Sequence, residues 1–178
     1  YLLLGCLSAL LTVSAFSQCG KFWTPNNENQ TAIVKDKAVS RASYPTEFRL
    51  FNLDLPAFSQ ALSSVTGNNR LKTSTVILLP NADGGIEEFE VVEASNFEPD
   101  LQARFPEIRA FSGKGITDKY ATLKLSISSE GVQTMVFRTE KDDEFIEPYS
   151  NDHKVYSVYK AHREKGKLPW TCTTEDKQ

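Results

Sequence analysis

Apolar and polar residues alternate along much of the chain with the two-residue period of β-strands. The alternation is clearest in segment 121–128, where Leu123, Leu125 and Ile127 are separated by Lys124 and Ser126. This pattern is typical of a strand with one buried face. Further strand-like segments lie at 48–55, 73–79, 86–92, 108–112, 132–138, 143–147 and 155–159. Because short turns separate most of them, we expect antiparallel pairing.

Two segments carry helical signals. Phe58, Leu62 and Val65 recur at helical spacing, and residues 98–105 fit a second short helix that ends before a proline. The expected fold class is therefore α+β, mainly antiparallel sheet with one or two short helices, built from residues 46–160.

The expected interior follows from the strand pattern. Two glycines, Gly113 and Gly115, are expected to break the strand that starts at residue 108. The run 132–137 does not keep strict alternation, which favours a bulge or a strand covered on both faces. The positions expected inside are Leu123, Leu125, Ile127, Val132, Met135 and Phe137.

The first 17 residues have the character of an export signal. Residues 1–16 carry no charge and are rich in leucine, but the apolar run is too short to span a bilayer. Small residues precede an expected cleavage between Ser17 and Gln18. The basic segment and initiator Met that usually precede such a run do not occur, so we expect the signal to be truncated at its start. A buried core helix is the alternative interpretation.

Removal of that signal leaves two cysteines, Cys19 and Cys172. In an oxidising compartment they either pair with each other or leave Cys172 free, and lipidation of Cys19 is a further alternative. The expected location is secreted, periplasmic or at the cell surface, with no stable membrane span after signal removal. Residues 18–45 are polar and are interpreted as a flexible lead-in, and residues 161–178 as a linker.

Composition excludes several function classes. The net charge is −3, and no run of Lys and Arg marks a nucleic-acid partner. Two histidines, nine residues apart, do not form a metal-binding helix face, and no nucleophile or phosphate-binding motif occurs. An acid–base pair of Glu107 and Asp118 is the one enzymatic hypothesis, and it requires the two carboxylates to lie close together in a cleft.

The segment from Phe105, with the order FPEIRAFSGKGITDKYATLKLSISSEGVQTMV followed by EFIEPYS, carries a resemblance. It resembles the N-terminal prodomain of secreted bacterial zinc metalloproteases with a reprolysin-like catalytic domain. The likeness extends over roughly residues 46–160 and is most specific between 105 and 118. Its motif residues are Phe105, Pro106, Ile108, Gly113, Gly115 and Asp118. A structural role suits them, with Ile108, Phe111 and Ile116 as core contacts and Asp118 closing a turn.

The resemblance implies a propeptide that helps the downstream catalytic domain of the same precursor to fold and keeps it inactive. The zinc would be held by that domain, which is expected to follow this chain. A free Cys172 on the linker is a hypothetical inhibitory ligand, because a thiolate can occupy the open position of a protease zinc. The alternative is a stand-alone secreted or surface-anchored binding module that recognises a partner through its sheet.

Overall fold

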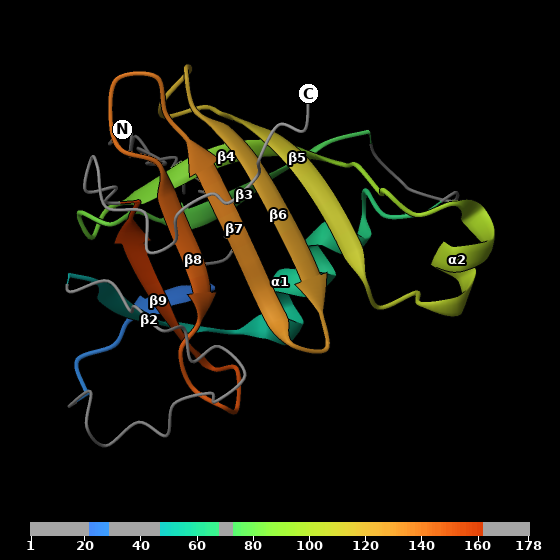
Figure 1. Ribbon diagram of the computed structural model, residues 1–178, viewed down its shortest axis with the longest axis horizontal. Coiled ribbons are helices and arrows are strands. Elements are labelled where there is room, and N and C mark those ends of the chain that lie inside the picture. Colours follow the sequence, from blue (N-terminus) through green and yellow to red (C-terminus); the bar gives the residue numbers. More distant parts are fainter. Residues whose placement is uncertain (1–21, 29–46, 68–72, 162–178) are drawn as a thin grey trace, which may run out of the picture.

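The computed structural model describes residues 22–28, 47–67 and 73–161 (Figure 1). Within these residues, strands and two short helices follow one another along the chain. They are β1 (Trp23–Pro25), β2 (Arg49–Leu53), α1 (Leu55–Ser63), β3 (Thr75–Pro80), β4 (Ile86–Glu93), α2 (Pro99–Arg104), β5 (Arg109–Gly115), β6 (Thr122–Ser128), β7 (Gly131–Phe137), β8 (Glu144–Pro148) and β9 (Val155–Lys160). The expected α+β class is confirmed.

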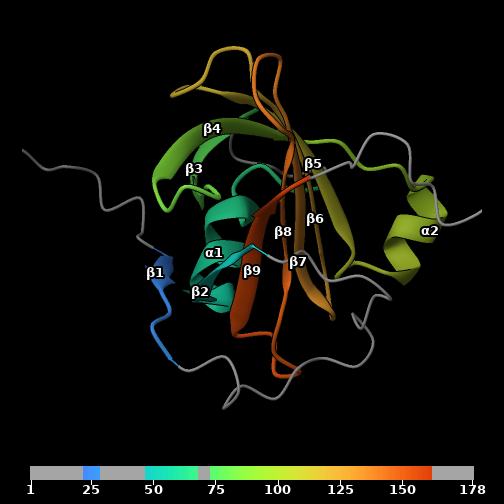
Figure 2. The same ribbon diagram turned by 60° about the vertical axis from the view of Figure 1, so that its left-hand side comes forward.

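The described strands form one sheet in the order β1-β2-β9-β8-β7-β6-β5-β4-β3, and every neighbouring pair is antiparallel. The sheet curls into a nearly closed barrel, because the edge strands β1 and β3 approach each other. Figure 2 shows α1 enclosed by this curl, while α2 lies outside it. Neither helix has the length and apolar character needed to cross a membrane.

Helix α1 is positioned by its capping residue and its apolar side. The Asp54 carboxylate accepts a hydrogen bond of 3.1 Å from the Ala57 backbone N–H, which satisfies a free donor at the helix start. Pro56 fits the first turn because its fixed φ suits a helix and its missing N–H is not needed there. Phe58 and Leu62 are completely buried against the inner face of the sheet. The helix therefore fills the barrel instead of covering it.

The inner face of the sheet forms one apolar core with α1. Trp23 packs edge-on against Phe58 and Tyr156, at ring-centroid distances of 6.0 and 5.3 Å. The other buried members of this core come from nearly every strand and include Phe51, Ile77, Leu79, Phe89, Val91, Phe111, Leu123, Leu125, Val132, Val136, Ile146 and Val158. A smaller apolar cluster of Leu50, Tyr149 and Val155 lies apart from this core.

Several sequence-based expectations were wrong. The lead-in 18–45 contains β1, whose Trp23 belongs to the core, because one large aromatic ring outweighs the polar residues around it. Strand β5 does not stop at Gly113 but continues to Gly115, since β4 pairs with it up to Gly115 and β6 up to Lys114.

Strand β7 also differs from expectation. Its pairing with β6 is regular from Thr122↔Phe137 to Ser128↔Gly131, without a bulge. Val132, Thr134 and Val136 face inward, so a threonine takes the central inward position. Met135 is therefore only half-buried, and Phe137 is exposed. Leu123, Leu125 and Val132 are buried as expected, and Ile127 packs against the core from a half-buried position.

Candidate functional site

A hollow of about 480 Å³ lies on the outer face of the sheet, across β5 to β8. This is the face turned to the viewer in Figure 1, with α1 behind it. Its lining includes Ala94, Ala110, Ser126, Gln133, Met135 and Phe145. The strand register explains the depression, because Ala110, Ser126 and Gln133 are cross-strand partners with small or flat side chains.

Larger side chains form the wall on one side of this hollow. Lys124, Met135 and Phe145 are successive partners across β6, β7 and β8, and the Phe145 ring stacks on Tyr159 at 5.6 Å between centroids. The Lys124 ammonium donates a 3.0 Å hydrogen bond to the Ser112 hydroxyl. The wall is thus an apolar stripe with one cation that is already engaged within the chain.

The carboxylate that lines the hollow also has a hydrogen-bond partner within the chain. Glu147 is buried, and its carboxylate accepts a 2.9 Å hydrogen bond from the Tyr159 hydroxyl. The hollow therefore presents mainly apolar side chains and uncharged hydrogen-bonding groups. Such a surface suits the binding of a polypeptide.

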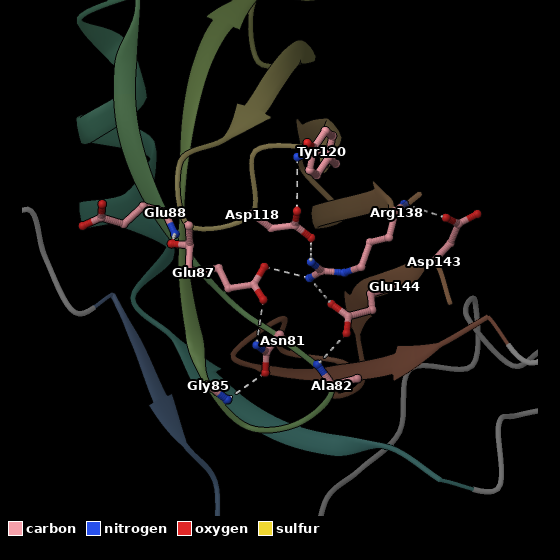
Figure 3. Close-up of polar contacts among 11 residues, drawn as sticks. Asn81, Ala82, Gly85, Glu87, Glu88, Asp118, Tyr120, Arg138, Asp143 and Glu144 are labelled. Carbon is pink, nitrogen blue, oxygen red and sulfur yellow. Dashed lines mark hydrogen bonds and ion pairs between the residues drawn. The ribbon is translucent and has the colours of Figure 1, made fainter. Parts of the chain in front are cut away.

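A second cluster of chemical groups lies at one end of the barrel and is centred on Arg138 (Figure 3). The guanidinium contacts three carboxylates, at 2.7 Å to Glu87, 2.6 Å to Glu144 and 3.0 Å to Asp118. The Arg138 side chain is only 2% exposed. We call these four side chains the Arg138 cluster.

The Arg138 cluster is joined to the backbone around it. Asp143 accepts a 2.9 Å hydrogen bond from the Arg138 backbone N–H, and the Asn81 amide donates one of 2.9 Å to Glu87. Burial would lower the pKa of the Arg138 guanidinium, but hydrogen bonds and ion pairs with Glu87 and Glu144 raise that pKa above its ordinary value. The Arg138 guanidinium therefore keeps its charge, and the cluster has the character of a structural clamp.

The structure also places the residues of the family-like segment. Phe105 and Pro106 are exposed after α2, and Ile108 is half-buried before β5. Phe111 is in the core as expected, whereas Ile116 is 43% exposed, because it lies past the inward-facing end of β5.

The two glycines of that segment occupy places where a side chain has no room. A Cβ on Gly113 would lie 2.8 Å from a methyl carbon of Val91, and one on Gly115 would overlap the carbonyl oxygen of Asp118. Asp118 closes the following turn by accepting a 3.1 Å hydrogen bond from the Tyr120 N–H, and its other oxygen binds Arg138.

The structure separates the carboxylates of the enzymatic hypothesis. Glu107 precedes β5 and Asp118 follows it, so the seven residues of the strand hold them about 23 Å apart at 3.3 Å per residue. Asp118 is also bound to Arg138. An acid–base pair of Glu107 and Asp118 is therefore excluded.

Other candidate residues lie outside the part of the chain that the structure describes. These are the cleavage residues Ser17 and Gln18, and the cysteines Cys19 and Cys172. Within the described part, no group of three or more His, Cys, Asp or Glu side chains is arranged to hold a metal ion.

Sequence reasoning missed the Arg138 cluster, although a signal was present. Glu87 shares the inward face of β4 with Phe89 and Val91, and Glu144 shares that of β8 with Ile146. A carboxylate in line with buried apolar residues requires a buried partner. The alternation therefore pointed to charges inside the sheet, but it did not identify the cation.

Comparisons with known proteins give no assignment, because no family model, no curated protein and no solved structure matches this chain.

Proposed function

We propose that this chain is the propeptide of a secreted zinc metalloprotease, which assists the folding of the catalytic domain in the same precursor and inhibits it. The observation that carries the proposal is the role of the family-like segment in the fold. Gly113 and Gly115 have no space for a side chain, and Asp118 joins a turn to Arg138. The resemblance thus lies at positions that the backbone requires, which supports a likeness of fold.

The surface of the sheet supplies a second line of support. A propeptide that templates or blocks another domain needs a rigid face, and the hollow lies in the middle of five successively paired strands, β4 to β8. Its apolar wall of Met135 and Phe145 is suited to a protein partner. The same hollow also favours the second candidate, a secreted or surface-anchored binding module, because it does not depend on a protease domain.

The coding region that continues beyond residue 178 in the same reading frame separates these candidates. A zinc-binding HExxHxxGxxH helix encoded there is expected under the propeptide proposal. A frame that closes within a few codons contradicts it and favours the binding module.

Inhibition in trans is the functional test. The separately purified catalytic domain would be assayed on a peptide substrate with increasing amounts of the full chain, and saturable inhibition is expected. An unrelated zinc protease of the thermolysin type serves as the specificity control. Equal inhibition of both enzymes, or of neither, contradicts the proposal.

Cys172 is proposed to contribute to this inhibition through its thiolate, which would bind the zinc of the catalytic domain. Replacement Cys172→Ser removes the thiolate and is expected to weaken inhibition, with Cys19→Ser as the matched control. If Cys19→Ser weakens inhibition equally, a disulfide between the two cysteines is the better explanation.

A further inference from the structure

The turn between β3 and β4, residues 81–85, reaches strands that are far from it in the sheet order. The Arg49 side chain of β2 donates a 3.0 Å hydrogen bond to the Ala82 carbonyl, and Lys160 of β9 pairs with Asp83 at 2.7 Å. The Ala82 N–H lies 3.4 Å from a Glu144 oxygen of β8. The turn therefore crosses the end of the barrel and joins its two sides.

The Arg138 cluster completes this closure from within. Arg138 follows β7, Glu87 belongs to β4, Asp118 to the β5–β6 turn and Glu144 to β8, so one cation joins three hairpins (Figure 3). No hydrogen bond of the sheet connects β4 with β7 or β8. The contacts across this end are consequently made by side chains, and most of them depend on ionised carboxylates.

The balance of charge in the cluster is uneven. One guanidinium faces three carboxylates, and Glu87 and Glu144 share the same terminal nitrogen, Nη2. The Arg138 Nε–H is buried and has no hydrogen-bond partner. Protonation of one carboxyl relieves repulsion between the two glutamates, but loss of the second and third charges leaves a buried cation without compensation, which is strongly unfavourable.

We propose that the Arg138 cluster and the β3–β4 turn form an acid-sensitive latch, which holds this end of the barrel closed at neutral pH and releases it in acid. Acid removes the charge of carboxylates, whereas the guanidinium stays charged. The other charged groups around the latch are Asp143 at the Arg138 backbone N–H, the exposed Asp83–Lys160 pair, Arg49 beside the turn, and Lys141 and Asp142, whose charges act on Asp83 and Lys160.

Asp83 adds to the effect in the same direction. A hydrogen bond from Lys160, and then its charge, lower the pKa of the Asp83 carboxyl below its ordinary value. A carboxyl whose pKa is lower in the folded state stabilises that state above the unfolded pKa, and this contribution is lost as the pH falls.

NMR of the ¹⁵N-labelled full chain between pH 7 and pH 3 tests the latch. The reporters are the backbone amides of Ala82 and Arg138 and the side-chain Nε–H of Arg138, and the reference amides are Val91 and Leu123 in the core. The reporters are expected to change together within this range as the pH falls, while the reference signals stay in place. Reporters and references changing in one transition, or reporters that do not change, overturn the proposal.

A double variant tests whether the carboxylates of the Arg138 cluster cause the acid transition. Glu87→Gln/Glu144→Gln keeps the shape and the acceptor oxygens but removes two charges, so the acid transition of Ala82 is expected to disappear. Glu130→Gln is the control, because Glu130 is exposed in the β6–β7 turn, at the other end of that hairpin from Arg138, and the transition is expected to remain. A double variant that titrates like the original protein overturns the assignment, and if that variant does not fold, the titration of the unmodified chain alone decides.

Discussion

At the scale of single residues, Gly115 shows how little freedom the family-like segment has. An alanine Cβ there would overlap the Asp118 carbonyl oxygen, which belongs to backbone and cannot rotate away. We expect Gly115→Ala to lower the free energy of unfolding by about 2–3 kcal/mol. Gly67→Ala is the control: its site is open, but its φ of +77° is strained for alanine, so a loss of about 1 kcal/mol is expected. Urea denaturation compares them, and equal losses would contradict the overlap argument.

Tyr156 gives a prediction for alkaline pH. Its side chain is completely buried, its hydroxyl accepts a 3.2 Å hydrogen bond from the Val132 N–H, and burial raises its pKa to about 12. A group whose pKa is raised on folding stabilises the folded state below the unfolded pKa, here near 10, and this stabilisation is lost as the pH rises to the folded value. The free energy of unfolding should fall between pH 10 and 12, by up to about 3 kcal/mol.

The matched variant is Tyr156→Phe, which keeps the ring but removes the ionisable hydroxyl. Its stability at pH 8 should be about 1 kcal/mol lower, because the Val132 N–H loses its acceptor. Its decline between pH 10 and 12 should be smaller than that of the original protein. Thermal melts over this range provide the measurement, and parallel curves for both proteins would assign the decline to other groups.

At the scale of elements, the spacing of apolar residues predicted the presence of strands and helices better than it predicted where they begin and end. Clean alternation placed β6, and helical spacing with a capping aspartate placed α1. The glycines of β5 were expected to break it because glycine usually weakens strands. They occur there because Val91 and the Asp118 carbonyl approach the backbone, a tertiary demand that sequence alone does not contain.

The contacts of the Arg138 cluster predict that the stability of the fold depends strongly on this one cation. Arg138→Ala would leave Glu87 and Glu144, both largely buried, without their partner, so we expect a loss of about 3–5 kcal/mol in the free energy of unfolding. Arg104→Ala is the control, because Arg104 is exposed at the end of α2 and should change stability by about 0.5 kcal/mol or less. Chemical denaturation measures both, and similar losses for the two variants would refute the role of the cluster.

At the scale of the whole molecule, the order of the strands is the part that sequence reasoning did not supply. Strand β2 pairs with β9, about a hundred residues later, and β3 ends on the opposite side of the sheet. Local pattern predicts that strands pair with their neighbours in sequence, as they do from β3 to β9. The Arg138 cluster was not foreseen because it depends on long-range contacts between strands, and the hollow was not foreseen because it depends on the register of β5, β6 and β7.

The hollow leads to the last prediction, which concerns the molecule as a binding partner. Ala110 lies in its floor on the outer face of β5, so Ala110→Phe would fill the hollow from outside while leaving the core untouched. Under the propeptide proposal, this variant should inhibit the catalytic domain at least about tenfold less well, which corresponds to about 1.4 kcal/mol of binding free energy. The melting temperature should stay unchanged within a few degrees, which separates loss of contact from loss of fold.

A matched change outside the hollow shows whether position decides this effect. Ser129 is exposed in the turn between β6 and β7 and does not line the hollow, so Ser129→Phe adds the same ring without blocking that surface. Inhibition by Ser129→Phe should equal that of the original chain. If Ala110→Phe inhibits equally well, contact with the catalytic domain lies elsewhere. If both variants lose inhibition, the added ring itself is responsible, because the two positions share only an exposed phenylalanine.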